Sequence, residues 1–268
     1  MSDPHQERQS AIDAHGIIGD LRSAALINDK GSVDFFCWPE FDSPSVFCSL
    51  LDTPDAGIFQ LAPDLPDARR EQIYLPDTNV LLTRWLSARA VVEITDLLAI
   101  GDSEDDLPLL IRRVRMVSGS AHLDLRCAVR FDYARAATKA QRTADDVCFT
   151  ADDQPGLRLR SSQPLQITDN AACARFELQQ EQCAEFILGA VDDPRFQADN
   201  SDLCLQRTLK FWRDWIARST YRGRWREMVN RSALALKLLT SRKHGAILAA
   251  ATFGLPETPG GIRNWDYR

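Results

Sequence analysis

Hydrophobic and polar side chains alternate along most of the first two hundred residues. From residue 23 to residue 191 the pattern has a period of two, the spacing of a β-strand with one buried face. The clearest apolar side consists of Leu123, Leu125, Cys127, Val129, Phe131 and Tyr133. Similar alternation recurs over residues 110–116 and 174–179, and turn-forming clusters separate the runs. The pattern predicts a mainly β fold of antiparallel sheets packed face to face.

The period changes near residue 200. Asn200 or Ser201 can cap a helix. Its apolar stripe consists of Leu205, Leu209, Trp212, Trp215 and Ile216. A second helix is predicted from about residue 225 to 239, and its C-terminal half is apolar on nearly every side. Such a helix requires several neighbours, and the roughly 29 residues that follow are too few to supply them. We therefore expect the chain to end inside a second, helical domain.

Composition is that of an ordinary globular protein. The 268 residues are 44% hydrophobic and 26% charged. No stretch of the sequence approaches the roughly 18 to 20 apolar residues that a membrane-spanning helix needs, so the sequence predicts no such helix.

Charge is unevenly distributed. Residues 201–243 hold eleven Lys and Arg against three Asp and Glu, whereas residues 1–200 hold 19 against 33. A basic segment can bind nucleic acid. However, its tryptophans fall on the stripe that packing requires, so we interpret it as a solvated surface beside an acidic neighbour. We expect no nucleic-acid binding.

Cysteine and histidine usage gives no sign of a disulfide framework or a metal site. The seven cysteines form no C-x-x-C pair, and most lie in apolar runs, which is typical of buried thiols in a reducing compartment. Residues 1–14 lack the apolar core of a signal peptide, so a cytoplasmic location is expected. The four histidines have no metal-ligand spacing, and no nucleotide or nucleophile motif is present. We expect neither metal nor cofactor.

Two stretches combine aromatic and acidic residues. One is the segment 19–47, in which an aromatic and acidic loop follows a predicted hairpin, and the other is the segment 255–268. Aromatic rings pack on the C–H faces of sugars, and carboxylates accept hydrogen bonds from their hydroxyls. The alternatives are a turn whose aromatics are buried for the first stretch and a Pro/Gly linker for the second. Composition alone leaves both pairs of interpretations open.

The same two stretches carry a family resemblance. The chain resembles the bacterial branch of glycoside hydrolase family 15, which contains glucoamylase-like and trehalase-like enzymes. The matching N-terminal positions are Gly19, Asp20, Ala24, Ala25, Leu26, Gly31, Ser32, Val33, Asp34, Cys37, Pro39 and residues 41–47. Residues 232–239, 255–257, 259–261 and 263–268 are also similar and follow in the family's order. Glu40 departs from the pattern, because relatives often carry a basic or amide side chain there.

The resemblance implies a domain order. Residues 1–198 would form an N-terminal β-sandwich, of the super-sandwich type, and residues 199–222 a helical linker. Residues 223–268 would begin an (α/α)₆ catalytic barrel. In the family, an inverting mechanism uses a general acid Glu and a general base Glu, and both would lie beyond residue 268. We therefore expect no catalytic residue within this chain and no activity from the chain alone.

The resemblance also suggests which residues contact a substrate. Tyr267 matches a tyrosine that lines the sugar pocket, and Trp265, Asp266 and Arg268 are its neighbours. Trp38, Phe41 and Asp42 could reach the rim of the active site, an idea that fails if the two rings prove to be buried in the sandwich core far from Tyr267. The implied substrate is an α-linked glucoside, either trehalose or a malto- or isomalto-oligosaccharide.

The function and the partners of the chain stay open at this point. The alternative to a glycosidase is a stand-alone carbohydrate-binding or interaction module. If the chain is part of a glycosidase, its partner would be the missing catalytic barrel, and a homo-oligomer is compatible with either function.

Overall fold

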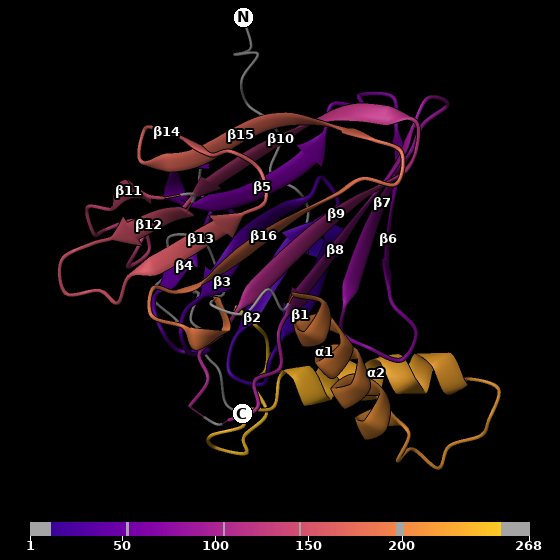
Figure 1. Cartoon of the computed structure of the whole chain (residues 1–268). Helices are drawn as coiled ribbons and strands as arrows, with labels where there is room; N and C mark the ends of the chain where they lie inside the picture. The colour runs from indigo at the N-terminus through magenta and orange to yellow at the C-terminus, as the bar shows by residue number, and fades with distance from the viewer. Residues whose placement is uncertain (1–11, 52–53, 104, 145, 197–200, 253–268) are drawn as a thin grey trace, which may run out of the picture.

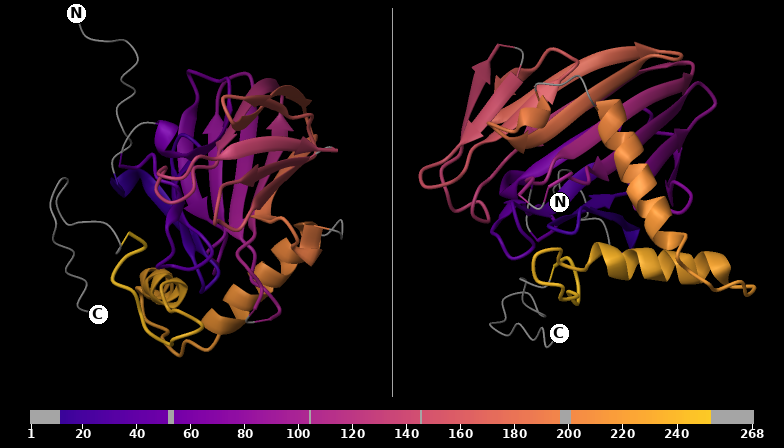
Figure 2. Two further views of the ribbon diagram at one scale, coloured as in Figure 1. Left: turned by 90° about the vertical axis from the view of Figure 1, so that its left-hand side faces the viewer. Right: turned by 60° about the horizontal axis from the view of Figure 1, so that its bottom comes forward.

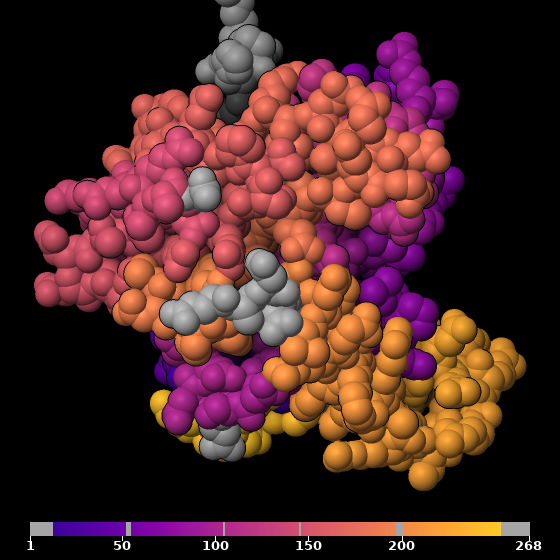
Figure 3. All heavy atoms as spheres, viewed as in Figure 1, coloured from indigo at the N-terminus to yellow at the C-terminus, as the bar shows by residue number. Residues whose placement is uncertain are grey.

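Two antiparallel sheets lie face to face, and two helices pack against one end of them (Figure 1). The computed structural model describes residues 12–51, 54–103, 105–144, 146–196 and 201–252. Turned views show the two helices at the lower end of the sandwich (Figure 2). The space-filling view shows the helical segment as a lobe below the sandwich (Figure 3). The predicted mainly β sandwich is confirmed.

The first sheet has the strand order β1-β2-β3-β5-β10-β15-β14, with β4 paired to β3. Its strands are β1 (His15–Gly19), β2 (Ala24–Asn28), β3 (Ser32–Cys37), β4 (Ser45–Phe47), β5 (Ile58–Pro63), β10 (Ser120–Ala128), β14 (Gln166–Thr168) and β15 (Ala171–Gln179). Short 3₁₀ helices occur at η1 (Ile12–Ala14), η2 (Pro54–Ala56) and η3 (Pro194–Phe196).

The second sheet has the order β11-β12-β13-β16-β9-β8-β7-β6. Its strands are β6 (Arg69–Tyr74), β7 (Leu81–Leu86), β8 (Val91–Leu98), β9 (Leu110–Ser118), β11 (Lys139–Thr143), β12 (Asp146–Thr150), β13 (Leu157–Ser161) and β16 (Cys183–Ala190). The facing sides of the two sheets share one hydrophobic core.

The predicted long strand is shorter than its pattern. Its apolar side is buried at Leu123, Leu125 and Cys127, as expected. The strand ends at Ala128, and three consecutive residues from Asp132 have positive φ. A strand cannot continue through left-handed backbone, so the prediction of Tyr133 as a strand residue is wrong.

A buried arginine, paired with a carboxylate on the neighbouring strand, joins the two sheets. Arg112 on β9 and Asp96 on β8 each have fully buried side chains, and Arg112 Nε lies 2.8 Å from Asp96 Oδ1. The same guanidinium donates to the carbonyl oxygens of Phe59, at 2.5 Å, and Gly31, at 2.8 Å, in the opposite sheet and its turn. The pair therefore ties the inner faces together through directional bonds as well as packing.

The helices are α1 (Ser201–Ile216) and α2 (Arg226–Leu238). The apolar stripe predicted for the first helix is confirmed, because Leu209, Trp212 and Ile216 are buried against the sandwich. The second helix is less covered than its sequence favours. Met228 is 64% exposed and Leu236 is 55% exposed, so part of its apolar surface has no neighbour in the described chain. Neither helix is long and apolar enough to cross a membrane, nor is any other within the described residues.

Candidate functional site

A buried acidic turn connects β1 to β2. The Asp20 carboxylate accepts hydrogen bonds from the backbone N–H groups of Arg22, at 2.9 Å, and Ser23, at 2.8 Å. Leu21, between them, has a φ of 72°, a left-handed conformation that this side-chain bonding supports. Burial raises the pKa of Asp20 to about 6, although the two N–H donors act in the opposite direction. The Gly-Asp motif thus shapes a turn.

The aromatic loop, residues 38–44, is fixed to this acidic turn. Ser23 Oγ donates to the carbonyl oxygen of Cys37 at the start of the loop. Arg22 Nη2 lies 2.7 Å from Glu40 Oε1, and the Glu40 N–H donates to Ser43 Oγ at 3.0 Å. Glu40, the departure from the family pattern, therefore has an ionic partner within the chain. Its observed role is to hold the loop against the turn.

The two rings of the aromatic loop are buried. Trp38 is 4% exposed, lies in the sandwich core, and its indole N–H donates to the Pro108 carbonyl at 3.3 Å. Phe41 is 7% exposed and packs in the cluster that includes Trp212 and Leu238 of the helices. This burial favours the packing interpretation over direct contact of the rings with a sugar. Asp42 is exposed, and a substrate-binding role for these three residues stays a prediction.

The other candidates, Trp265, Asp266, Tyr267 and Arg268, lie outside the described residues. The last described residues of the chain pack beside the acidic turn. The Arg242 N–H donates to the Leu21 carbonyl at 2.8 Å, and Ala251 packs in the same cluster as Phe41. The first predicted stretch and the entry into the second therefore meet in one region.

A charged pocket of about 250 Å³ opens in this region. Its lining residues are Asp20, Leu21, Arg22, Glu40, Gly101, Asp105, Asp106, Arg242 and Lys243. Carboxylates and cations of this kind can bind hydroxyl groups or ions, but the lining has no aromatic ring on which a sugar could stack. Among the described residues, no group of three or more His, Cys, Asp or Glu could hold a metal ion.

Sequence reasoning found only part of this pocket. Asp20 and Glu40 belong to the stretches that it singled out, whereas Arg22, Asp106 and Arg242 were missed. Arg22 could have been found from the sequence, because it is a charged residue between the matched positions Asp20 and Ala24. The other two come from a distant loop and from the segment after α2, and only the fold brings them together.

Comparison with known proteins agrees with the fold. Residues 5–184 match the family model described as "Trehalase-like, N-terminal". The chain belongs to this family. The match covers strands β1 to β15 and ends at the start of β16, so the trehalase-like domain corresponds to the sandwich.

Curated relatives extend the likeness over the helices. A "Trehalase" of Mycobacterium tuberculosis is 34% identical over 295 residues, an alignment that takes in 100% of this chain and 43% of the relative. A "Trehalase" of Thermoplasma volcanium is 32% identical over 274 residues, which cover 100% of this chain and 44% of the relative. A "Trehalase" of Mycolicibacterium smegmatis is 34% identical over 282 residues, which cover 95% of this chain and 42% of the relative. The trehalase-like chain thus spans less than half the length of these relatives.

Proposed function

We propose that the intact protein is an α-glycosidase of glycoside hydrolase family 15, and that this chain is its N-terminal part. The substrate would be trehalose or a malto- or isomalto-oligosaccharide. The observation that carries the proposal is the alignment of nearly the whole chain, sandwich and helices together, with relatives named trehalase. Trehalose is therefore the first substrate to test.

The proposed reaction inverts the configuration at the attacked carbon. One glutamic acid protonates the oxygen of the leaving sugar while a second glutamate activates water on the opposite face. The two carboxyl groups lie about 6.5 to 9.5 Å apart to leave room for that water. The resemblance assigns neither role to a residue of this chain. We therefore expect residues 1–268 alone to leave trehalose unhydrolysed.

The proposed domain order is a sandwich over residues 1–198, a linker over 199–222 and the start of the (α/α)₆ barrel over 223–268. Two features support it. The last long strand, β16, ends before α1, and buried residues of α1 pack against residues of the sandwich. Helix α2 leaves Met228 and Leu236 exposed, as expected of a helix whose further neighbours come from a barrel.

We propose that Tyr267, with Trp265, Asp266 and Arg268, contacts the substrate. The support is their match to the family motif and the position of residue 251 beside the acidic turn. In the longer protein, Tyr267→Ala should lower kcat/KM for trehalose at least about tenfold, because one contact to a bound sugar contributes about 1.4 kcal/mol or more. Tyr221→Ala is the matched control, since Tyr221 is 38% exposed and lies between the two helices.

The test of the proposed function compares two proteins. The reading frame beyond codon 268 is determined, and the longer product and residues 1–268 are each incubated with trehalose, maltose and isomaltose. Glucose release by the longer product alone is the expected result. Calorimetric titration of residues 1–268 with the same sugars should give no binding heat. Saturable heat would instead favour a carbohydrate-binding module.

A further inference from the structure

The Asp20 carboxylate shapes the acidic turn through one of its oxygens. The backbone N–H groups of Arg22 and Ser23 both donate to Oδ1. No other residue of the described chain donates a hydrogen bond to Oδ2. The side chain is 5% exposed and lines the charged pocket. A buried carboxylate oxygen without a donor is uncommon, so Oδ2 calls for an explanation beyond the shape of the turn.

The acidic turn also joins three other segments of the chain. Its bonds to the aromatic loop are described above. The Leu21 carbonyl oxygen accepts the N–H of Arg242, at 2.8 Å, in the segment after α2, residues 239–252. Arg22 Nη1 donates to the Asp106 carbonyl oxygen, at 3.2 Å, in the loop after β8. The turn is therefore the junction between the aromatic loop and the segment after α2.

Charged groups face Asp20 from each of these segments. They are Arg22 of the turn, Glu40 of the aromatic loop, Asp105 and Asp106 of the loop after β8, and Arg242 and Lys243 of the segment after α2. Glu40 is engaged by Arg22, at 2.7 Å, and lies 4.0 Å from Lys243. The positive charge of Arg242 favours the ionised form of Asp20. Within the described part of the chain no carboxylate oxygen lies within 4.0 Å of Arg242, so this attraction acts across the pocket.

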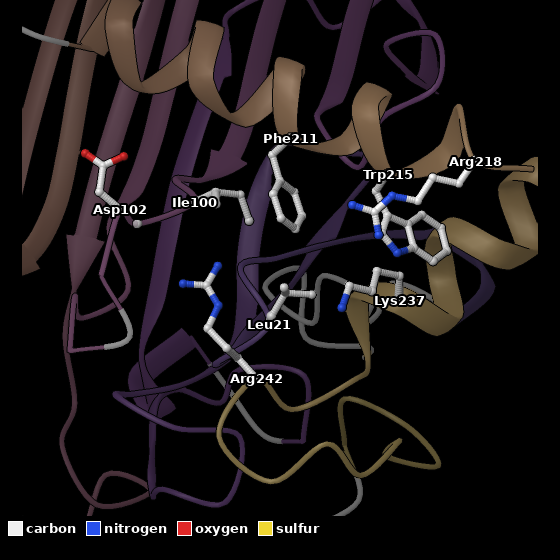
Figure 4. A pocket seen from close by; sticks show the side chains of 9 residues that line it. Leu21, Ile100, Asp102, Phe211, Trp215, Arg218, Lys237 and Arg242 are labelled. Atoms are coloured by element: carbon white, nitrogen blue, oxygen red, sulfur yellow. The ribbon is translucent and has the colours of Figure 1, made fainter.

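Arg242 is also repelled from its other side. A second pocket, of about 460 Å³, lies where the helices meet the sandwich, and Arg242 lines it together with Arg218 and Lys237 (Figure 4). Burial lowers the pKa of Lys237, and the positive charges of Arg242 and Arg218 lower it further. Leu21, the neighbour of Asp20, lines both pockets. An ionised Asp20 therefore offsets part of the repulsion on the segment after α2.

Ionisation of Asp20 lowers the stability of the folded chain. Burial raises its pKa from 3.8 to about 6, so the folded chain holds the charged form at neutral pH against the cost of desolvation. An uncharged side chain of the same shape would form the turn without this cost. Ionisable groups held in an unfavourable environment are typical of functional sites.

We propose that ionised Asp20 is a positioning residue for substrate binding, a role that rests on the proposed glycosidase function. Its Oδ1 shapes the turn, and the charge shared with Oδ2 attracts Arg242 and so holds the segment after α2 beside the aromatic loop. That segment leads along the chain to the proposed substrate contacts, residues 265–268. Loss of the charge therefore weakens substrate binding and leaves the bond-breaking step unchanged.

The test measures the kinetics of the longer protein with the disaccharide that it hydrolyses best. Asp20→Asn keeps an oxygen that accepts both N–H groups but removes the charge. At pH 7.5 it should raise KM about fivefold or more with kcat unchanged, as expected when an interaction is lost equally from bound substrate and transition state. At pH 5 the two KM values should converge, because Asp20 of the unaltered protein is then largely neutral as well.

A purely structural role predicts a different result. A destabilised variant would lose active protein, which lowers the apparent kcat and leaves KM unchanged. We expect instead that Asp20→Asn binds substrate more weakly at pH 7.5 although its free energy of unfolding is higher, since the cost of the buried charge is removed. Urea unfolding of the same preparations gives this second measurement.

Further variants assign the effect to Arg242. Arg242→Gln should raise KM as Asp20→Asn does, and the double variant should add little, because each change breaks the same attraction. Arg242→Lys keeps the positive charge and should keep the KM of the unaltered protein. Asp124→Asn is the matched control, since it removes the same charge from a side chain on β10 that is 53% exposed, and its KM should be unchanged.

The outcomes distinguish two failures. If the unaltered longer protein hydrolyses none of trehalose, maltose and isomaltose, the proposed function fails and the positioning role fails with it. If the unaltered protein is active, the positioning role alone is overturned by an unchanged KM of Asp20→Asn at pH 7.5, or by a rise in KM that is the same at pH 5. An unchanged KM of Arg242→Gln would overturn it as well.

Discussion

Replacement of Arg112 by methionine should strongly destabilise the sandwich. The variant leaves the Asp96 carboxylate, which is fully buried, without its cation, and it removes the donors to the carbonyl oxygens of Phe59 and Gly31. Breaking a buried ion pair from one side costs about 3 to 5 kcal/mol. Since domains are stable by only about 5 to 15 kcal/mol, the variant should lose a large share of the total.

Urea unfolding of residues 1–268, followed by tryptophan fluorescence, measures this loss. Arg115→Met is the matched control, because Arg115 lies on the same strand and its 2.6 Å pair with Glu181 involves side chains that are 53% and 61% exposed. An exposed pair contributes at most about 1 kcal/mol. Equal losses in the two variants, or a loss below about 1 kcal/mol for Arg112→Met, would show that the buried pair does not stabilise the sandwich in this way. The double variant Asp96→Leu/Arg112→Met should recover part of the stability, since no charge then remains unpaired.

Three further predictions concern the turn, the aromatic loop and the cysteines. Because the folded-state pKa of Asp20 is raised from 3.8 to about 6, its protonated form contributes stability at low pH that is lost as the pH rises through this interval. Asp20→Asn should remove that loss, which is about 3 kcal/mol at most for a two-unit shift. If the variant and the unaltered chain differed in unfolding free energy by the same amount at pH 4.5 and pH 7.5, this prediction would be contradicted. Phe41→Ala should cost about 3 kcal/mol or more in urea unfolding because the ring is buried, whereas Asp42→Ala, at an exposed position, should stay within about 0.5 kcal/mol. A thiol reagent at pH 8 should modify exposed Cys183 in the native chain and reach Cys127, whose pKa burial raises, only on unfolding; native-state reaction of Cys127 would show that the core is open.

The strands were predictable because alternation is a local property. Leu123 and Leu125 face the core as their spacing indicates, and the stripe of α1 packs as its period indicates. Arg112 and Asp96 were missed because both are charged residues on the buried side of an otherwise apolar pattern. Asp96 lies opposite Arg112 on the neighbouring strand, whereas the carbonyls of Phe59 and Gly31 belong to the opposite sheet and its turn, and no sequence spacing reveals that proximity.

The candidate site was predictable only in outline. The aromatic loop was identified by its density of rings and acids, but the choice between ligand contact and burial for Trp38 and Phe41 depended on tertiary packing. The positive charge of the helical segment was also visible in the sequence. That Arg218 and Lys237 converge on one pocket follows from the crossing of the two helices, which the sequence does not contain.

We propose that this trehalase-like chain is the N-terminal part of an inverting glycosidase. Proton NMR of the longer protein with α,α-trehalose tests it most directly, because the anomeric protons of the two glucose products are resolved before they mutarotate. Inversion at one carbon predicts one α-glucose and one β-glucose from each trehalose, with no products from residues 1–268 alone. Release of α-glucose only, or the absence of hydrolysis of trehalose, maltose and isomaltose by the longer protein, would contradict the proposal.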